Sequence, residues 1–171
     1  LYKSGGRNIV ATGNTSDNVN NGVELTGNIS INTTITNIGE NIPYVIPHLI
    51  ISKDTTVNVD AGTIMKVEDG MLFGEKSCID IYGKLLTNGT SDKNIVITSL
   101  KDDTIAGDTN GDGKSTVAEN GDWGSINVLA SRGASNATTL NYTDVRYGGD
   151  KQTGYMLGGN GALIVNNSII K

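Results

Sequence analysis

The sequence predicts an all-β protein whose short strands wind into a parallel β-helix, a solenoid. The first observation behind this prediction is composition: Gly is abundant at 23 residues, Pro is scarce at 2, and Asn, Thr, Ile and Val recur throughout. β-Branched residues lose rotamer freedom in helices, whereas Asn and Gly tolerate the backbone of tight turns. The second and third observations are the recurrence of short alternating apolar segments and the spacing within them.

The alternating segments are only a few residues long, and Gly, Asn or Asp separates each from the next. They are Val57-x-Val59, Ile79-x-Ile81, Ile95-x-Ile97, Ile126-x-Val128, Leu140-x-Tyr142 and Leu163-x-Val165. Each has the period of two that is typical of a strand. Two pairs look like copies of one unit. Residues 57–64 resemble 79–85 at an offset of about 22, and residues 140–147 resemble 163–170 at about 23.

The spacing in the second pair predicts a corner. Leu140-x-Tyr142-x-x-Val145-x-Tyr147 contains a step of three residues between two steps of two. A flat strand cannot keep all four side chains on one face with this spacing, but a chain that bends between two short strands can. A coil of about 20–25 residues per turn, stacked in register, is a parallel β-helix. The rival is an antiparallel sandwich with Asn-Gly hairpins such as Asn88-Gly89 and Asn160-Gly161, but it requires longer strands.

The 171 residues are enough for one domain. We expect an N-terminal cap of irregular strands over residues 1–42, in which Asn14–Gly22 is a loop and Leu25, Ile29, Ile31 and Ile35 form a capping pair. Parallel β-helix coils then follow over residues 43–171, with an insertion at 102–122. Pro43 and Pro47 bracket Tyr44–Ile46, which we predict to be an edge strand.

Charge and hydrophobicity exclude nucleic acid binding and membrane insertion from the expected functions. The formal net charge is −5 and there is no basic run, so nucleic acid is not an expected partner. No apolar stretch approaches the roughly 18 residues of a membrane span, so no membrane insertion is expected. The chain begins at Leu1 without a signal peptide, and we interpret it as a piece of a longer protein whose targeting segment lies outside it. The oligomeric state is not predicted.

The single cysteine excludes an intrachain disulfide. We expect Cys78 to be a small buried or half-buried side chain. A catalytic thiol would need a histidine partner, and the only histidine, His48, follows Pro47 at a turn or strand start. We assign no catalytic residues to the sequence.

One motif carries chemistry. Asp108–Glu119 fits the twelve-residue pattern D-x-[DN]-x-[DN]-G-x5-E of a calcium loop. Ca²⁺ takes six to eight oxygen ligands, and Gly allows the sharp turn between them. The predicted Ca²⁺ ligands are the side chains of Asp108, Asn110 and Asp112, the backbone carbonyl of Lys114, Thr116 directly or through water, and Glu119.

The context of this loop differs from that of an EF-hand. It is flanked by predicted strands, Ile95–Leu100 and Ile126–Val128, instead of helices. The helix pair of a calcium sensor is therefore not expected. The predicted role is to hold an insertion between two coils. Asp102, Asp103 and Asp122 are further candidate ligands, and Asp122 would replace Glu119 if Glu119 does not bind. The alternative interpretation is an Asn/Asp-Gly turn with solvated acids.

Several motifs resemble bacterial right-handed parallel β-helix proteins of the cell surface or secreted fraction. They are 43–46, 56–67, 83–90, 95–99, 108–113 leading to Gly121-Asp122-Trp123-Gly124, and Val145-Arg146-Tyr147-Gly148-Gly149. The resemblance covers roughly residues 43–170. It implies a right-handed solenoid and an extracellular location, either secreted or associated with the cell surface or cell wall.

Two classes of function remain open. The first is a non-catalytic, calcium-stabilised surface module that acts in adhesion or binds polysaccharide or a host or substrate surface. The second is a calcium-dependent polysaccharide lyase or glycoside hydrolase. A lyase would need a Lys or Arg base near a calcium-bound uronate, and Asp144 and Arg146 are spaced to share one face of a strand. The absence of an evident catalytic set favours the first class.

Overall fold

The computed structural model describes residues 2–3, 21–72, 75–129, 137–149 and 154–171. Over these ranges the regular elements are short β-strands, and no helix occurs among them. The strands pair in parallel, except for the antiparallel pair β8 (Met71–Leu72) and β9 (Glu75–Lys76). The prediction of an all-β fold with stacked parallel strands is therefore confirmed, and the arrangement is consistent with a β-helix-like solenoid.

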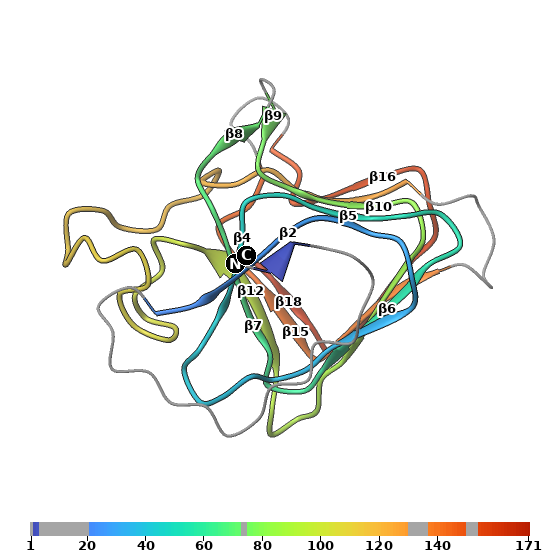
Figure 1. The fold of residues 1–171 in the computed structure, drawn as a ribbon, viewed down its shortest axis with the longest axis horizontal. Coiled ribbons are helices and arrows are strands. Elements are labelled where there is room, and N and C mark those ends of the chain that lie inside the picture. The colour runs from blue at the N-terminus through green and yellow to red at the C-terminus, as the bar shows by residue number, and fades with distance from the viewer. Residues whose placement is uncertain (1, 4–20, 73–74, 130–136, 150–153) are drawn as a thin grey trace.

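The strands stack into two continuous sheets. One follows the order β16 (Leu157–Gly159), β13 (Ile126–Val128), β10 (Ile79–Ile81), β5 (Leu49–Ile51), β2 (Val23–Ile29), β4 (Tyr44–Ile46), β7 (Ile64–Val67), β12 (Ile95–Ser99), β15 (Thr143–Val145) and β18 (Ile169–Ile170), and β1 (Tyr2–Lys3) pairs with β2. The other follows β17 (Leu163–Asn166), β14 (Thr138–Asn141), β11 (Lys84–Asn88), β6 (Thr56–Asp60) and β3 (Thr33–Ile35). Successive strands of each sheet overlap in Figure 1, while the β8–β9 hairpin projects at the top.

Strand β2 divides the larger sheet into two faces. Its first residues, Val23 and Glu24, pair with β4, and its last residues, Gly27 to Ile29, pair with β5. The chain therefore presents three strand-lined faces, each built from one short strand per coil. Alternate side chains point inward, as a period of two requires. Val57 and Val59 of β6, Ile79 and Ile81 of β10, and Leu49 and Ile51 of β5 join one buried apolar cluster.

The expected strand segments are confirmed, except that β14 ends at Asn141, one residue before Tyr142. The expected alignment between the segments is wrong. Residues 79–85 do not repeat 57–64, because Val57 pairs with Leu85 of β11 and Ile79 pairs with Leu49 of β5. Leu140 pairs with Val165 rather than Leu163. The number of residues per coil varies along the chain. A sequence offset between two strands of one face therefore does not predict which strands pair on another face.

The predicted corner after Leu140 is present, but different side chains point inward. Tyr142 and Tyr147 have φ values of 46° and 60° and are only half-buried. Thr143 and Val145 are the buried residues that continue the inward face of Leu140. The bend therefore falls on Tyr142 itself, in the left-handed backbone region that a non-Gly residue seldom adopts.

Two strands in the described part of residues 1–42, the segment expected to form an N-terminal cap, pair with later coils. Strands β2 and β3 hydrogen-bond in parallel to β5 and β6. Most of the predicted loop Asn14–Gly22 lies outside the described residues. Tyr44–Ile46 is a strand as predicted, but the edge position is wrong, because β4 lies between β2 and β7. The two prolines flank this strand, so neither removes a hydrogen bond from within it.

Tyr44 provides a prediction about alkaline pH. Its side chain is buried and its hydroxyl donates a hydrogen bond to the carbonyl of Thr36 at 3.0 Å. Burial raises the Tyr44 pKa to about 12, and the nearby Asp60 carboxylate acts in the same direction. An unfolded tyrosine titrates near 10, so the folded state binds more protons between pH 10 and 12. Stability that is present below pH 10 is therefore lost as pH rises through this window.

We expect the free energy of unfolding to fall by about 2 kcal/mol more in the native protein than in Tyr44→Phe between pH 9 and 12. Urea unfolding of both proteins at the two pH values measures this difference. Both proteins carry the same other titratable groups, so an identical loss in both would contradict the assignment to Tyr44.

Candidate metal centre

A long excursion separates two strands of the stack. Strand β12 ends at Ser99 and β13 begins at Ile126, and the residues between them form turns and bends without a strand. This segment projects from the stack on the left of Figure 1, in yellow to orange. The prediction that strands flank the calcium motif is confirmed. Two buried aspartates, one near each end of the excursion, fasten it to the stack.

Asp122 fastens the C-terminal end of the excursion. Its Oδ2 accepts hydrogen bonds from the Ser99 hydroxyl at 2.6 Å and from the Glu119 backbone N–H at 3.1 Å. Its Oδ1 lies 3.0 Å from the Lys101 ammonium, which also pairs with Asp69. The Asp122 residue is 3% exposed. The carboxylate is thus fully used in holding the excursion against the end of β12.

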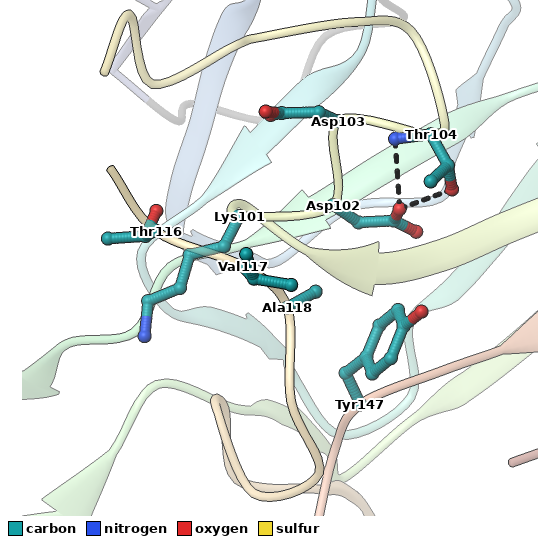
Figure 2. A pocket seen from close by; sticks show the side chains of 8 residues that line it. All are labelled: Lys101, Asp102, Asp103, Thr104, Thr116, Val117, Ala118 and Tyr147. Carbon is teal, nitrogen blue, oxygen red and sulfur yellow. Dashed lines mark hydrogen bonds between the residues drawn. The ribbon is translucent and has the colours of Figure 1, made fainter. Parts of the chain in front are cut away.

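Asp102 fastens the N-terminal end. It is buried, accepts hydrogen bonds from the Thr98 hydroxyl at 2.7 Å and the Thr104 backbone N–H at 3.1 Å, and also contacts the Thr104 hydroxyl. Figure 2 shows Asp102 turned toward Thr104, while Asp103 points the other way. Of these two neighbouring aspartates, Asp103 is the one whose carboxylate faces the calcium motif.

Within the motif, Asp108 organises the backbone. Its Oδ1 accepts hydrogen bonds from the N–H groups of Gly111 and Asp112, at 2.8 and 3.2 Å, and its Oδ2 accepts one from Gly113 at 2.7 Å. Gly113 has a φ of 73°, a backbone region that favours Gly. The first acid of the motif therefore closes the tight loop that the sequence pattern predicts.

Asp112, Asn110 and Thr116 form a second group of contacts. The Asn110 amide donates to Asp112 Oδ2 at 2.9 Å and to the Thr116 hydroxyl at 3.2 Å. The Thr116 hydroxyl also donates to Asp112, and this bond is the main reason that the pKa of Asp112 lies below its usual value. The carbonyl oxygen of Asn110, Oδ1, is buried and has no hydrogen-bond partner in the structure. A buried acceptor without a donor is unusual, because its desolvation is not compensated.

Three carboxylates meet beside Asn110, and we call them the acid cluster. Oxygen atoms of Asp103, Asp108 and Asp112 lie within 4.8 Å of one another. The pKa of Asp103 is raised, mainly by burial and then by the charge on Asp108, with smaller contributions from Asp112 and Asp102. Since the folded state holds this proton more tightly than the unfolded chain, ionisation of Asp103 at neutral pH opposes folding. A bound cation would reverse that penalty.

A buried lysine partly compensates these acids. Lys66 of β7 is fully buried and its ammonium donates a hydrogen bond to the carbonyl of Gly107 at 2.7 Å. Burial lowers the Lys66 pKa, and the charges of Asp102, Asp103 and Asp108 act in the opposite direction. One positive charge near three carboxylates leaves the group negative, so the attraction for a divalent cation persists but is reduced.

Of the remaining predicted ligands, Glu119 lies outside the acid cluster. Lys114 and Glu119 are exposed, and the Glu119 backbone N–H is bonded to Asp122. The structure therefore brings together Asp108, Asn110, Asp112 and Thr116 from the predicted set and adds Asp103, which the sequence marked only as a further candidate. Asp102 and Asp122 serve as structural anchors.

A small open pocket of about 150 Å³ lies between the start of the excursion and the last residues of the calcium motif. Figure 2 shows its lining: Lys101, Asp102, Asp103, Thr104, Thr116, Val117, Ala118 and Tyr147. Tyr147 comes from the next coil, after β15, so the excursion leans against the stack on this side. Two of the lining groups, Lys101 and Asp102, are engaged in the anchoring contacts described above.

The pair proposed for lyase chemistry is an ion pair. Arg146 donates to Asp144 Oδ2 from Nε at 2.8 Å and also from Nη2, and its Nη1 lies 3.9 Å from Asp102. These contacts raise the pKa of Arg146, led by the hydrogen bond to Asp144. A guanidinium held in this way is a poor proton acceptor.

Sequence reasoning missed two associations. The burial of Lys66 by the excursion depends on how the excursion packs, and no local pattern signals it. His48 and Cys78 lie side by side, with 3.6 Å between His48 Nδ1 and Cys78 Sγ. Each residue directly precedes a short apolar strand segment, and that shared position is the one signal that would have placed them together.

Comparison with known proteins provides no relative. No family profile, curated protein or solved structure matches the chain. In the part of the chain that the structure describes, no helix is long and apolar enough to cross a membrane.

Proposed function

We propose that this chain is a calcium-stabilised, non-catalytic β-helix module of a secreted or cell-surface protein. The observation that carries the proposal is the meeting of Asp103, Asp108 and Asp112 beside the buried, unpartnered Oδ1 of Asn110. Hard oxygen ligands of this kind are the set that Ca²⁺ prefers. The backbone carbonyl of Lys114 and the hydroxyl of Thr116, at two further positions of the motif, would add oxygen ligands to this shell.

The proposed role of the ion is to hold the excursion. Asp102 and Asp122 already fix its two ends to β12, whereas the segment between them carries the clustered negative charge. Ca²⁺ would neutralise this charge only in the folded chain, because the three carboxylates meet only there. Stabilisation without a change of fold follows, since the flanking elements are strands in register with the stack.

The extracellular assignment is supported by the expected strength of the site. Extracellular calcium modules bind in the range of about 10⁻⁴–10⁻³ M. Three carboxylates with the Lys66 ammonium nearby suit weak binding of this order rather than that of an intracellular sensor. The right-handed winding that the family resemblance implies accords with the strong preference of parallel crossovers for that hand.

Thermal unfolding in Ca²⁺ and in EGTA tests the proposal. At a Ca²⁺ concentration about 100-fold above its Kd, linkage gives about 2.7 kcal/mol, which is a rise in Tm of about 5–10 °C for a domain of this size. Asp112→Asn should abolish most of this shift. Asp92→Asn is the matched control, because Asp92 is exposed and outside the acid cluster. Equal Tm values in Ca²⁺ and EGTA for the native chain would refute the proposal.

A second pair of variants identifies the closing carboxylate. We expect Asp103→Asn to weaken Ca²⁺ binding more than Glu119→Gln, because Asp103 belongs to the acid cluster and Glu119 does not. Isothermal titration calorimetry measures both. The reverse order would show that the loop closes on Glu119, as the motif alone predicts.

The proposed binding role rests on the shape of the stack. Three faces of parallel strands offer extended surfaces to a polysaccharide or to another surface, and Tyr82 and Tyr155 are exposed aromatic side chains. Affinity electrophoresis in gels containing plant or bacterial polysaccharides tests for such binding. Unaltered migration in every gel would restrict the module to a scaffold role.

A further inference from the structure

A cluster of three different side chains, separate from the acid cluster, lies on the outer side of one sheet. His48 directly precedes β5 and Cys78 directly precedes β10, and these strands pair with Leu49 opposite Ile79. Leu49, Ile51, Ile79 and Ile81 are buried in the core. Side chains alternate along a strand, so Asp80 and the two preceding residues, His48 and Cys78, point to the other side of the sheet.

The three side chains converge. Cys78 Sγ lies 3.6 Å from His48 Nδ1 and 4.0 Å from His48 Nε2, and Nε2 lies 3.2 Å from Asp80 Oδ2. One ligand atom from each residue lies within 4.8 Å of the others. The side chains of His48 and Asp80 are 14% and 18% exposed, so the cluster is shielded but can be reached from solvent.

The next coil orients the carboxylate. Asp80 Oδ1 accepts a hydrogen bond from the Asn127 amide at 2.8 Å, and Asn127 Oδ1 in turn accepts one from the Ser125 hydroxyl at 2.7 Å. Asn127 pairs directly with Asp80 in the sheet. With Oδ1 held in this way, Oδ2 faces His48. Supporting hydrogen bonds of this kind are what orient the ligands of protein metal sites.

We infer that His48, Cys78 and Asp80 form a binding site for a zinc-like divalent transition metal. Thiolate, imidazole and carboxylate are the three ligand types that Zn²⁺ takes, and with three protein ligands a water fills the fourth position. Usual zinc bond lengths in a tetrahedron place sulfur and nitrogen about 3.5 Å apart and nitrogen and oxygen about 3.3 Å apart. The observed 4.0 and 3.2 Å lie close to these separations, and a rotation of the imidazole that carries Nδ1 away from Sγ would direct the Nε2 lone pair at the metal.

The ligand types separate this site from the calcium motif. The site is distinct from the acid cluster, since a thiolate is a poor ligand for Ca²⁺ and a good one for Zn²⁺.

Titration of the reduced full chain with Co²⁺ tests this inference. We expect a near-ultraviolet thiolate-to-cobalt absorption band that disappears on addition of Zn²⁺. Cys78→Ser should abolish the band. Asp80→Asn, which removes a direct ligand, should weaken binding by at least the roughly 10- to 100-fold that loss of a supporting hydrogen bond costs. Asp103→Asn, in the acid cluster, should leave the band unchanged, which separates this site from the proposed calcium site. Absence of a band in the native chain, or a band that survives in Cys78→Ser, would overturn the inference.

Alkylation of the native chain provides a measurement that needs no variant. Zn²⁺ bound at this site should slow the reaction of Cys78 with iodoacetamide at least about tenfold, because a coordinated thiolate is a weaker nucleophile. Ca²⁺ should have no such effect. An alkylation rate independent of Zn²⁺ would exclude Cys78 as a ligand.

Discussion

Replacement of Asp122 by Ala should lower the free energy of unfolding by about 3 kcal/mol, the lower end of the range for breaking a buried ion pair. The substitution removes the acceptor for the Ser99 hydroxyl and the Glu119 N–H and leaves the half-buried Lys101 ammonium with Asp69 alone. Urea unfolding in excess EGTA measures this loss independently of any metal. The end of the excursion should also become more susceptible to proteases.

Asp69→Ala is the matched control for this prediction. Asp69 pairs with the same Lys101 ammonium, but its side chain is 37% exposed. An ion pair at the surface contributes about 0–1 kcal/mol. A loss in Asp122→Ala no greater than that in Asp69→Ala would show that burial of Asp122 does not determine how the excursion is held.

The second large effect concerns Trp123, which follows this anchor. The indole is fully buried and its Nε1–H donates a hydrogen bond to the carbonyl of Arg146 at 2.9 Å. Gly148 packs against the ring so closely that a Cβ on it would lie 2.8 Å from Trp123 Cζ2. Trp123→Ala should therefore cost about 3–5 kcal/mol through the cavity that it leaves.

Trp123→Phe distinguishes the contribution of packing to stability from that of the hydrogen bond. Phe retains most of the apolar contact and loses the N–H, so we expect a loss of about 1–2 kcal/mol. Urea unfolding followed by far-ultraviolet circular dichroism measures both variants, since Trp123 is the only tryptophan and fluorescence is lost with it. Equal losses in Ala and Phe would show that the hydrogen bond, rather than packing, dominates.

Local patterns in the sequence predict the strands well. Ile79-x-Ile81 and Ile126-x-Val128 are strands with the predicted inward residues, because alternation records directly which side chains are buried. The register between coils is harder to predict from the sequence. Val57 and Ile79 have similar neighbours in the sequence, yet they lie in different sheets, since every strand-lined face of the stack requires the same alternating pattern.

The candidate metal centre was predictable only where its ligands belong to one continuous stretch of sequence. Asp108, Asn110 and Asp112 are fixed by the spacing of one continuous motif. Asp103 and Lys66 reach this motif from outside it, from the start of the excursion and from a neighbouring strand. Likewise, the meeting of His48 and Cys78 depends on the pairing of β5 with β10. Contacts between coils are set by register, which a single sequence does not display.

The parallel stacking has a kinetic consequence. Each rung joins strands that lie at least a full coil apart along the chain, as Val57 with Leu85 or Leu86 with Thr139. Such pairings are non-local, and folds dominated by them refold on a time scale of about milliseconds to seconds. The cost of closing a loop grows only slowly with its length, so the excursion before Thr139 adds little delay. An early coil, once formed, offers its open edge as a template on which the next can align.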